Sequence, residues 1–193
     1  MYVKHTRNNL SKIKEEAEKN RFLKGFCGGC EGILRLTIGN TYVVYCVEIH
    51  EGGIMYYICE PKLWHPTPYP DLLFDIVDGR PSRYWSINDA SAKGQFLGKR
   101  NDTVIAFDEW RTDEAVYKKL VDHKEHETIV FHQYKQKTDL ECPDPSVSLG
   151  ATNLEGNWVM CPECCDAWEA ISEDGMTTCP QCLRRLLNPK FKD

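Results

Sequence analysis

The sequence predicts an α+β protein with a mainly antiparallel sheet, two helices and a small cysteine-rich module at the C-terminus. Several short segments alternate apolar and polar residues, or are apolar on both faces, and glycine turns separate them as in antiparallel strands. Residues 8–21 and 112–124 instead have apolar residues at spacings of three and four, the period of a helix. Near the C-terminus, Cys-Pro-x-Cys occurs twice.

Length and composition restrict the class of protein. The 193 residues allow one core of ordinary size and a small additional module. A hydrophobic content of 41% and a charged content of 27% are typical of soluble globular proteins. No stretch approaches the roughly 20 apolar residues of a membrane span. The polar segment 1–18 lacks the apolar run that a secretory signal contains. Zinc thiolates and free cysteines survive best in a reducing compartment, so we expect a cytoplasmic protein without membrane association.

An amphipathic helix is expected over residues 8–21. Leu10, Ile13 and Ala17 form its apolar stripe, and Lys and Glu side chains cover the opposite face. This helix is expected to pack against the sheet that follows it in the chain.

Three consecutive strands are expected next, over residues 32–38, 41–50 and 54–59. The first alternates apolar and polar residues, and Gly39-Asn40 is a two-residue hairpin turn that would pair it with the second. Residues 41–50 are apolar on both faces over most of their length. We therefore expect this strand at the centre of the sheet, with another layer packed over it.

The region that follows is more irregular. Prolines at four positions between 61 and 70 predict a stiff loop. Beyond it, a short strand or a helical turn leading into one is expected at 71–77, strands at 82–87, 103–107 and 127–133, and the second helix at 112–124. Residues 141–156 are rich in Pro, Ser, Gly, Asp and Asn, which predicts a linker between an α+β domain, 1–140, and a C-terminal module, 157–193.

The strongest chemical signal is Cys161-Pro162-Glu163-Cys164 followed by Cys179-Pro180-Gln181-Cys182. Two residues between cysteines let one tight turn present both thiolates to one ion, and a second turn completes a tetrahedral shell. Residues 167–171 and 176–178, between the two turns, are expected to pair as short strands across Asp174-Gly175.

The segment from about residue 157 to 191 resembles a four-cysteine zinc ribbon of the rubredoxin-like type. The resemblance implies one structural Zn²⁺ ion held by Cys161, Cys164, Cys179 and Cys182. Iron in an electron-transfer site is the alternative. Rubredoxins usually carry glycine after the second cysteine of each turn, where this sequence has Cys165 and Leu183.

A second metal site is a further hypothesis. If Gly39-Asn40 is a hairpin turn, Cys30 lies beside His50, so Cys27, Cys30 and His50 would provide three ligands. A redox dithiol at Cys27 and Cys30 is another interpretation, and the simplest is a glycine turn with buried thiols.

Aromatic and arginine side chains concentrate in expected loops and strand ends, and these residue types are enriched where proteins bind one another. They are equally common in cores. The candidates for an interaction surface are Trp64, Tyr69, Arg80, Arg83, Trp85, Trp110 and Arg111. A carboxylate metal cluster of Asp75, Asp78, Asp108 and Glu109 would instead indicate a hydrolytic enzyme.

The net charge and the absence of known catalytic motifs reduce the number of function classes that fit the sequence. The net charge is −5, and residues 151–193 contain four Lys or Arg against seven Asp or Glu, so nucleic-acid binding is not favoured. The sequence has no phosphate-binding glycine loop, His-Glu-x-x-His motif or Gly-x-Ser-x-Gly motif. We expect a cytoplasmic zinc-containing protein that acts through protein–protein contacts, for example of the inhibitor or toxin-immunity type. The alternatives are a nucleic-acid-linked or transcriptional regulator that uses the zinc ribbon, and a metal- or thiol-dependent enzyme.

Overall fold

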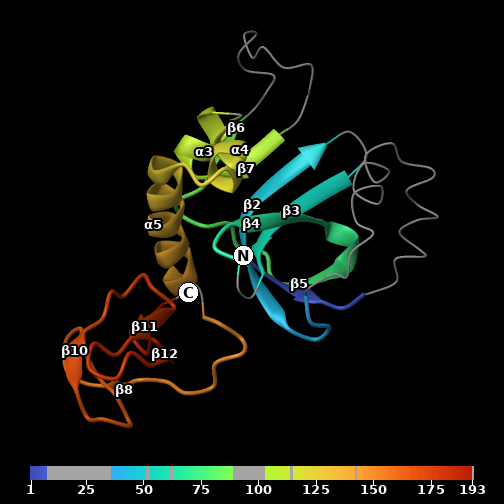
Figure 1. The fold of residues 1–193 in the computed structure, drawn as a ribbon. Coiled ribbons are helices and arrows are strands. Elements are labelled where there is room, and N and C mark those ends of the chain that lie inside the picture. The colour runs from blue at the N-terminus through green and yellow to red at the C-terminus, as the bar shows by residue number, and fades with distance from the viewer. Residues whose placement is uncertain are drawn as a thin grey trace. The chain divides into compact units, whose positions relative to one another are not determined.

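A computed structural model of the chain describes residues 1–7, 36–50, 53–60, 63–88, 103–113, 115–141 and 143–192 (Figure 1). In this part of the chain, antiparallel sheets occur together with three α-helices, which confirms the α+β class. The chain divides into two compact units, Met1–Tyr134 and Lys135–Asp193, and the division falls inside the last helix. The helix predicted over residues 8–21 lies outside the described residues.

Most of the elements are labelled in Figure 1, and the bounds of all of them follow in chain order. They are β1 (Tyr2–His5), β2 (Thr41–His50), β3 (Gly53–Cys59), β4 (Pro66–Pro70), a 3₁₀ turn η1 (Asp71–Leu73), β5 (Phe74–Asp78), β6 (Ser86–Asn88), β7 (Thr103–Ala106), α3 (Asp108–Thr112), α4 (Val116–Val121), α5 (Glu125–Glu141), β8 (Thr152–Asn153), β9 (Trp158–Met160), β10 (Ala167–Glu169), β11 (Met176–Thr178) and β12 (Arg185–Leu187). None of the described helices has the length and apolar composition to cross a membrane.

Strand β2 is the centre of the seven-stranded sheet of the first unit. One edge of β2 pairs with β3, and the other edge pairs with β1 near Val43 and with β7 near Val47. Strand β4 extends the sheet beyond β3, β5 beyond β1, and β6 beyond β7, all antiparallel. The central position predicted for residues 41–50 is therefore confirmed.

Both faces of β3 are buried, and each face belongs to a different hydrophobic cluster. Tyr56 and Ile58 pack in one cluster, with residues of β1, β2 and β5. Met55 and Tyr57 alternate with them and pack in the other cluster, to which α3, α4 and α5 contribute. The helices thus supply the second layer that a doubly buried strand requires.

Strand β1 pairs with the start of β2, and the described end of the predicted strand 32–38, residues 36–38, is not a strand. Described residues 36–40 form a turn, in which the carbonyl of Asn40 accepts a hydrogen bond from the His5 N–H at 3.0 Å. Tyr2 and Val3 are buried, so this short N-terminal strand fills the edge of β2. Four residues are too few for alternation to stand out in the sequence, which explains the error. Residues 32–35 lie outside the described part.

The proline-rich segment 61–70 also differs from the prediction of an irregular loop. Its second half is β4, which pairs with β3 from Met55 to Cys59. Proline cannot donate a backbone hydrogen bond and is therefore confined to strands with one unpaired edge. Strand β4 is the last strand at its end of the sheet, so its prolines are compatible with strand pairing.

Residues 127–133, predicted to be a strand, belong to α5. Phe131 is 1% exposed, whereas Ile129, two residues earlier, is 51% exposed. β-Branched and aromatic residues favour strands only weakly, and burial of one helical face overrides that preference here. The helix predicted at 112–124 is shorter than expected, because α3 already ends at Thr112 and α4 extends only from Val116 to Val121.

The second unit contains one three-stranded and one two-stranded sheet. Strand β10 pairs with β9, and β11 pairs with β12. The predicted strands within 167–171 and 176–178 therefore exist, but their predicted pairing with each other is wrong. Each instead pairs with the strand on the other side of the nearest Cys-Pro-x-Cys sequence.

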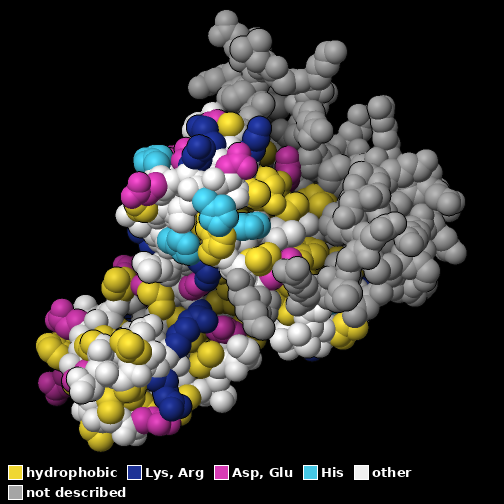
Figure 2. Space-filling view, in the orientation of Figure 1, with side chains coloured by type: hydrophobic (Ala, Val, Ile, Leu, Met, Phe, Trp, Pro, Cys, Tyr) yellow, Lys and Arg dark blue, Asp and Glu magenta, His cyan; other side chains and the backbone are white. Residues whose placement is uncertain are grey.

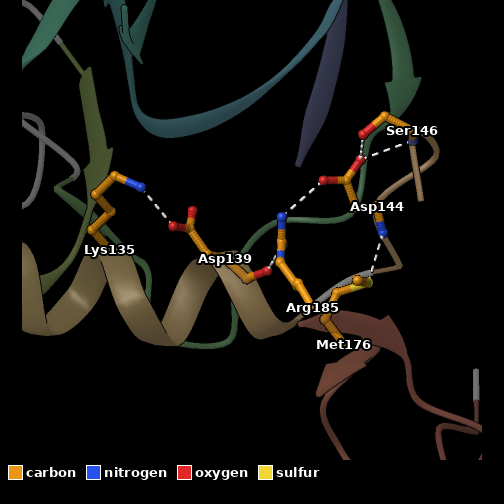
Figure 3. A network of polar contacts seen from close by, with 6 residues as sticks. All are labelled: Lys135, Asp139, Asp144, Ser146, Met176 and Arg185. Atoms are coloured by element: carbon orange, nitrogen blue, oxygen red, sulfur yellow. Dashed lines mark hydrogen bonds and ion pairs between the residues drawn. The ribbon is translucent and has the colours of Figure 1, made fainter. Parts of the chain in front are cut away.

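The C-terminal end of α5 belongs to the second unit, and other residues of that unit bind it (Figure 3). Arg185, in β12, donates a hydrogen bond to the carbonyl of Asp139 and contacts the carboxylate of Asp144 at 2.8 Å. The N–H of Gly175 donates to the carbonyl of Glu141 at 2.9 Å. The last carbonyls of a helix have no partner within it, so these bonds satisfy groups that would otherwise require water.

Candidate metal centre

Each Cys-Pro-x-Cys sequence forms the loop of a β-hairpin. In the first cysteine loop (161–166), the Cys165 N–H donates to the Cys161 carbonyl at 3.0 Å, and the Cys161 N–H donates to Asp166 at 2.8 Å. The second cysteine loop (179–184) repeats both bonds around Cys179, at 3.0 and 2.9 Å. The centre is therefore built from two loops of the same backbone geometry.

The two loops bring the four predicted cysteines together. Their Sγ atoms all lie within 4.8 Å of one another. The Cys161–Cys182 and Cys164–Cys179 sulfur distances are 3.7 and 3.5 Å, too long for disulfide bonds of about 2.05 Å. Zinc–sulfur bonds of about 2.3 Å place the ligands of a tetrahedron about 3.8 Å apart. The four thiols therefore fit a tetrahedral metal site.

Burial divides the four cysteines into two pairs. Cys161 and Cys179, the first cysteine of each loop, are fully buried and pack with Val159 and Leu186 in the core of the second unit. Cys164 and Cys182, the second cysteines, are exposed. A metal ion bound by all four would join the core of this small unit to its surface loops.

Backbone N–H groups of the two cysteine loops change the pKa values of the cysteine thiols. The N–H groups of Cys164 and Glu163 lower the pKa of Cys161 to about 7. The N–H of Asp166 has the same effect on Cys164, but desolvation and the neighbouring thiols outweigh it and raise that pKa to about 12. Such close thiols cannot all ionise without a cation, so metal binding must displace protons. These donors belong to the backbone, so no residue type in the sequence indicates them.

Cys165 and Leu183, which directly follow the second cysteine of each loop, have left-handed backbone conformations. Their φ angles are 60° and 59°. This conformation costs a non-glycine residue about 1–2 kcal/mol, whereas glycine adopts it freely. Glycine at these positions in rubredoxin-like ribbons therefore has a steric reason, and this chain has the loop geometry without the glycine.

We expect Leu183→Gly to stabilise the second unit by up to about 1 kcal/mol, because relief of backbone strain outweighs glycine's entropic cost. Leu183 is 75% exposed, so little packing is lost. The free energy of unfolding of the metal-loaded protein, from denaturant titration, measures the effect. Ile171→Gly is the matched control, since Ile171 is 60% exposed and has no positive φ; it should destabilise by about 0.5–1 kcal/mol. Equal destabilisation by both variants would contradict the prediction.

The other predicted metal site cannot be assembled from described residues. Cys27 and Cys30 lie outside them, and His50 is placed only as the last backbone position of β2, paired with Gly53. A position of Cys30 beside His50 requires pairing of 32–38 with 41–50, and the described end of the first segment is a turn. The second metal site stays a prediction.

The residues predicted to form an interaction surface are divided between core and surface. Tyr69 and Trp110 are buried in two different hydrophobic clusters and are therefore core residues. Trp64, Trp85 and Arg111 are half-buried, and Arg80 and Arg83 are exposed. Residue type alone could not separate these groups, because aromatic rings serve both packing and binding.

The carboxylates proposed as a hydrolytic cluster do not converge. Asp75, Asp78 and Asp108 each form an ion pair with an arginine. Asp75 and Asp78 lie on β5, whereas Asp108 and Glu109 lie on α3. Within the described ranges, the four cysteines are the one group of three or more Cys, His, Asp or Glu side chains placed to share a metal ion.

Comparison with known proteins gives no match, whether the chain is set against protein-family models, curated proteins or solved structures.

Proposed function

We propose that Cys161, Cys164, Cys179 and Cys182 bind one Zn²⁺ ion, and that this ion stabilises the fold of the second unit as a zinc ribbon. The observation that carries the proposal is the convergence of four Sγ atoms within 4.8 Å from two hairpin loops. Four protein ligands fill a tetrahedral shell and leave no open position for water or substrate, as in structural zinc sites. Such an ion supports folding and takes no part in chemistry.

We also propose that the chain acts by binding another protein. The second unit exposes large apolar side chains, among them Trp158 and Ile171, and yellow side chains are visible on its surface in Figure 2. Exposed apolar and aromatic groups are frequent in protein interfaces. The net charge of −5 favours a basic partner over nucleic acid. Unchanged binding of co-purified partners after Trp158→Ser and Ile171→Ser would contradict this part of the proposal.

Elemental mass spectrometry of protein purified without added metal tests the zinc assignment. We expect one zinc ion per chain and a colourless protein, because Zn²⁺ has a filled d shell. Iron bound by four thiolates would absorb visible light, and an iron content of one per chain would contradict the assignment and favour the electron-transfer alternative. Two metal ions per chain would leave the ribbon assignment intact and make Cys27, Cys30 and His50 the leading second site.

A further inference from the structure

The first unit contains a cavity of about 330 Å³ among α3, α4 and α5. Its apolar wall is formed by Phe107, Val116 and Val130. Binding pockets for small ligands typically have volumes of roughly 300–1,000 Å³ and combine apolar walls with a few polar groups. The cavity is therefore large enough to accept a long side chain or a small organic molecule.

The charged groups of this cavity are predominantly acidic. Glu109, Asp113 and Glu127 line it, together with one permanent cation, Lys119. Three carboxylates against one ammonium leave a formal surplus of two negative charges when His126, which also lines the cavity, is neutral. This surplus repels phosphates and acidic peptides and attracts a cation.

The single ammonium is shared between two carboxylates. Lys119 Nζ lies 2.6 Å from Asp113 Oδ2 but 3.5 Å from Glu127 Oε1. The second oxygen of Asp113 accepts a hydrogen bond from the Ala115 N–H at 2.9 Å. Glu127 is only 15% exposed and has the longer of the two contacts with Lys119. A second cation beside Glu127 would balance a carboxylate that is largely withdrawn from water.

We propose that this cavity binds an arginine or lysine side chain of a basic protein partner. The alkyl stem would contact Phe107, Val116 and Val130, and the cationic head would pair with Glu127 and Glu109. Arginine is the better fit, because its guanidinium can donate to two carboxylates at once. The proposal rests on the proposed protein-binding function for the source of the ligand, whereas the zinc assignment is independent of it.

Titration of the full-length, metal-loaded protein with a short arginine-containing peptide, followed by NMR chemical shifts, tests the proposal. We expect saturable shifts at residues 107–130, with a dissociation constant on the order of 1 mM for a single side chain. Glu127→Gln keeps the shape of the side chain and should weaken binding about tenfold. Glu125→Gln is the matched control, because Glu125 lies on the same helix, is exposed and does not line the cavity.

Three further measurements separate the outcomes. A peptide with neutral citrulline in place of arginine should not saturate, and Val130→Phe, which fills the cavity, should abolish arginine-peptide binding without changing the charge. Saturation by free agmatine but not by the peptide would overturn the assignment to a protein partner. Absence of saturation by either, or equal binding by the Glu127→Gln and Glu125→Gln proteins, would overturn the site. Either of these last two results would refute the cavity site alone. The proposal that the exposed residues of the second unit bind a protein would still stand.

Discussion

Cys161→Ser and Cys179→Ser proteins are expected to contain less than about a tenth of the wild-type metal and to lose the folded second unit. Both side chains are fully buried and are proposed ligands, so each substitution removes a metal bond at the centre of a small core. Structural zinc contributes about 10–16 kcal/mol in isolated zinc-finger peptides, and there binding and folding are one equilibrium. Elemental analysis and ¹H–¹⁵N NMR spectra of the same samples would measure both losses.

Cys165→Ser is the control for this experiment. Cys165 directly follows the proposed ligand Cys164, is exposed and does not belong to the four-sulfur cluster. Its replacement should leave the metal content at the wild-type value. The first unit has its own hydrophobic clusters, so its NMR signals should persist in every variant. Full metal content in the Cys161→Ser protein, or equal loss in Cys165→Ser, would refute the four-cysteine centre.

Phe131→Ala should lower the free energy of unfolding of the first unit by about 3–5 kcal/mol, the usual cost of truncating a buried aromatic residue. Phe131 is 1% exposed, and its ring makes edge contacts with Tyr45 and Trp110 at centroid distances of 5.7 and 6.3 Å. Truncation would therefore open a cavity where α5 packs on the sheet. Denaturant titration monitored by circular dichroism gives the change.

Comparison of Ile129→Ala with Phe131→Ala tests whether this segment is a helix or a strand. In a strand, residues 129 and 131 face the same side, so both substitutions would be costly. In α5 they point in different directions, and Ile129 is 51% exposed. We expect Ile129→Ala to cost less than about 0.5 kcal/mol, as surface substitutions usually do. Similar losses at both positions would contradict the helix and restore the strand that the sequence suggested.

The features that sequence could predict are those determined by a few adjacent residues. Residues 41–50 and 54–59 are strands because their apolar side chains suit a buried sheet, whatever lies beside them. The four cysteines converge because two Cys-Pro-x-Cys loops each present a pair of thiols. Such short-range patterns are visible without knowledge of the rest of the fold.

The features that sequence could not predict depend on distant partners. Strand β1 occupies the edge assigned to 32–38, and each strand flanking a cysteine loop pairs across its own loop. Tyr69 is buried in the core and Arg83 is exposed on the surface, and no local sequence pattern distinguishes these two environments. The acidic cavity likewise requires α3, α4 and α5 to meet, so its carboxylates appear in the sequence as ordinary helix charges.

Bonds between β12 and the end of α5, both in the second unit, would extend the effect of the proposed metal centre beyond its own loops. Strand β12 begins just after the second cysteine loop, and its Arg185 holds the carbonyl of Asp139, 46 residues earlier in the chain. Release of the metal would free β12 and leave the final turn of α5 without its external partners. Amide hydrogen exchange in that turn would then rise. We therefore expect hydrogen exchange at the end of α5 to report whether the proposed metal site is occupied, without any probe attached to the cysteines.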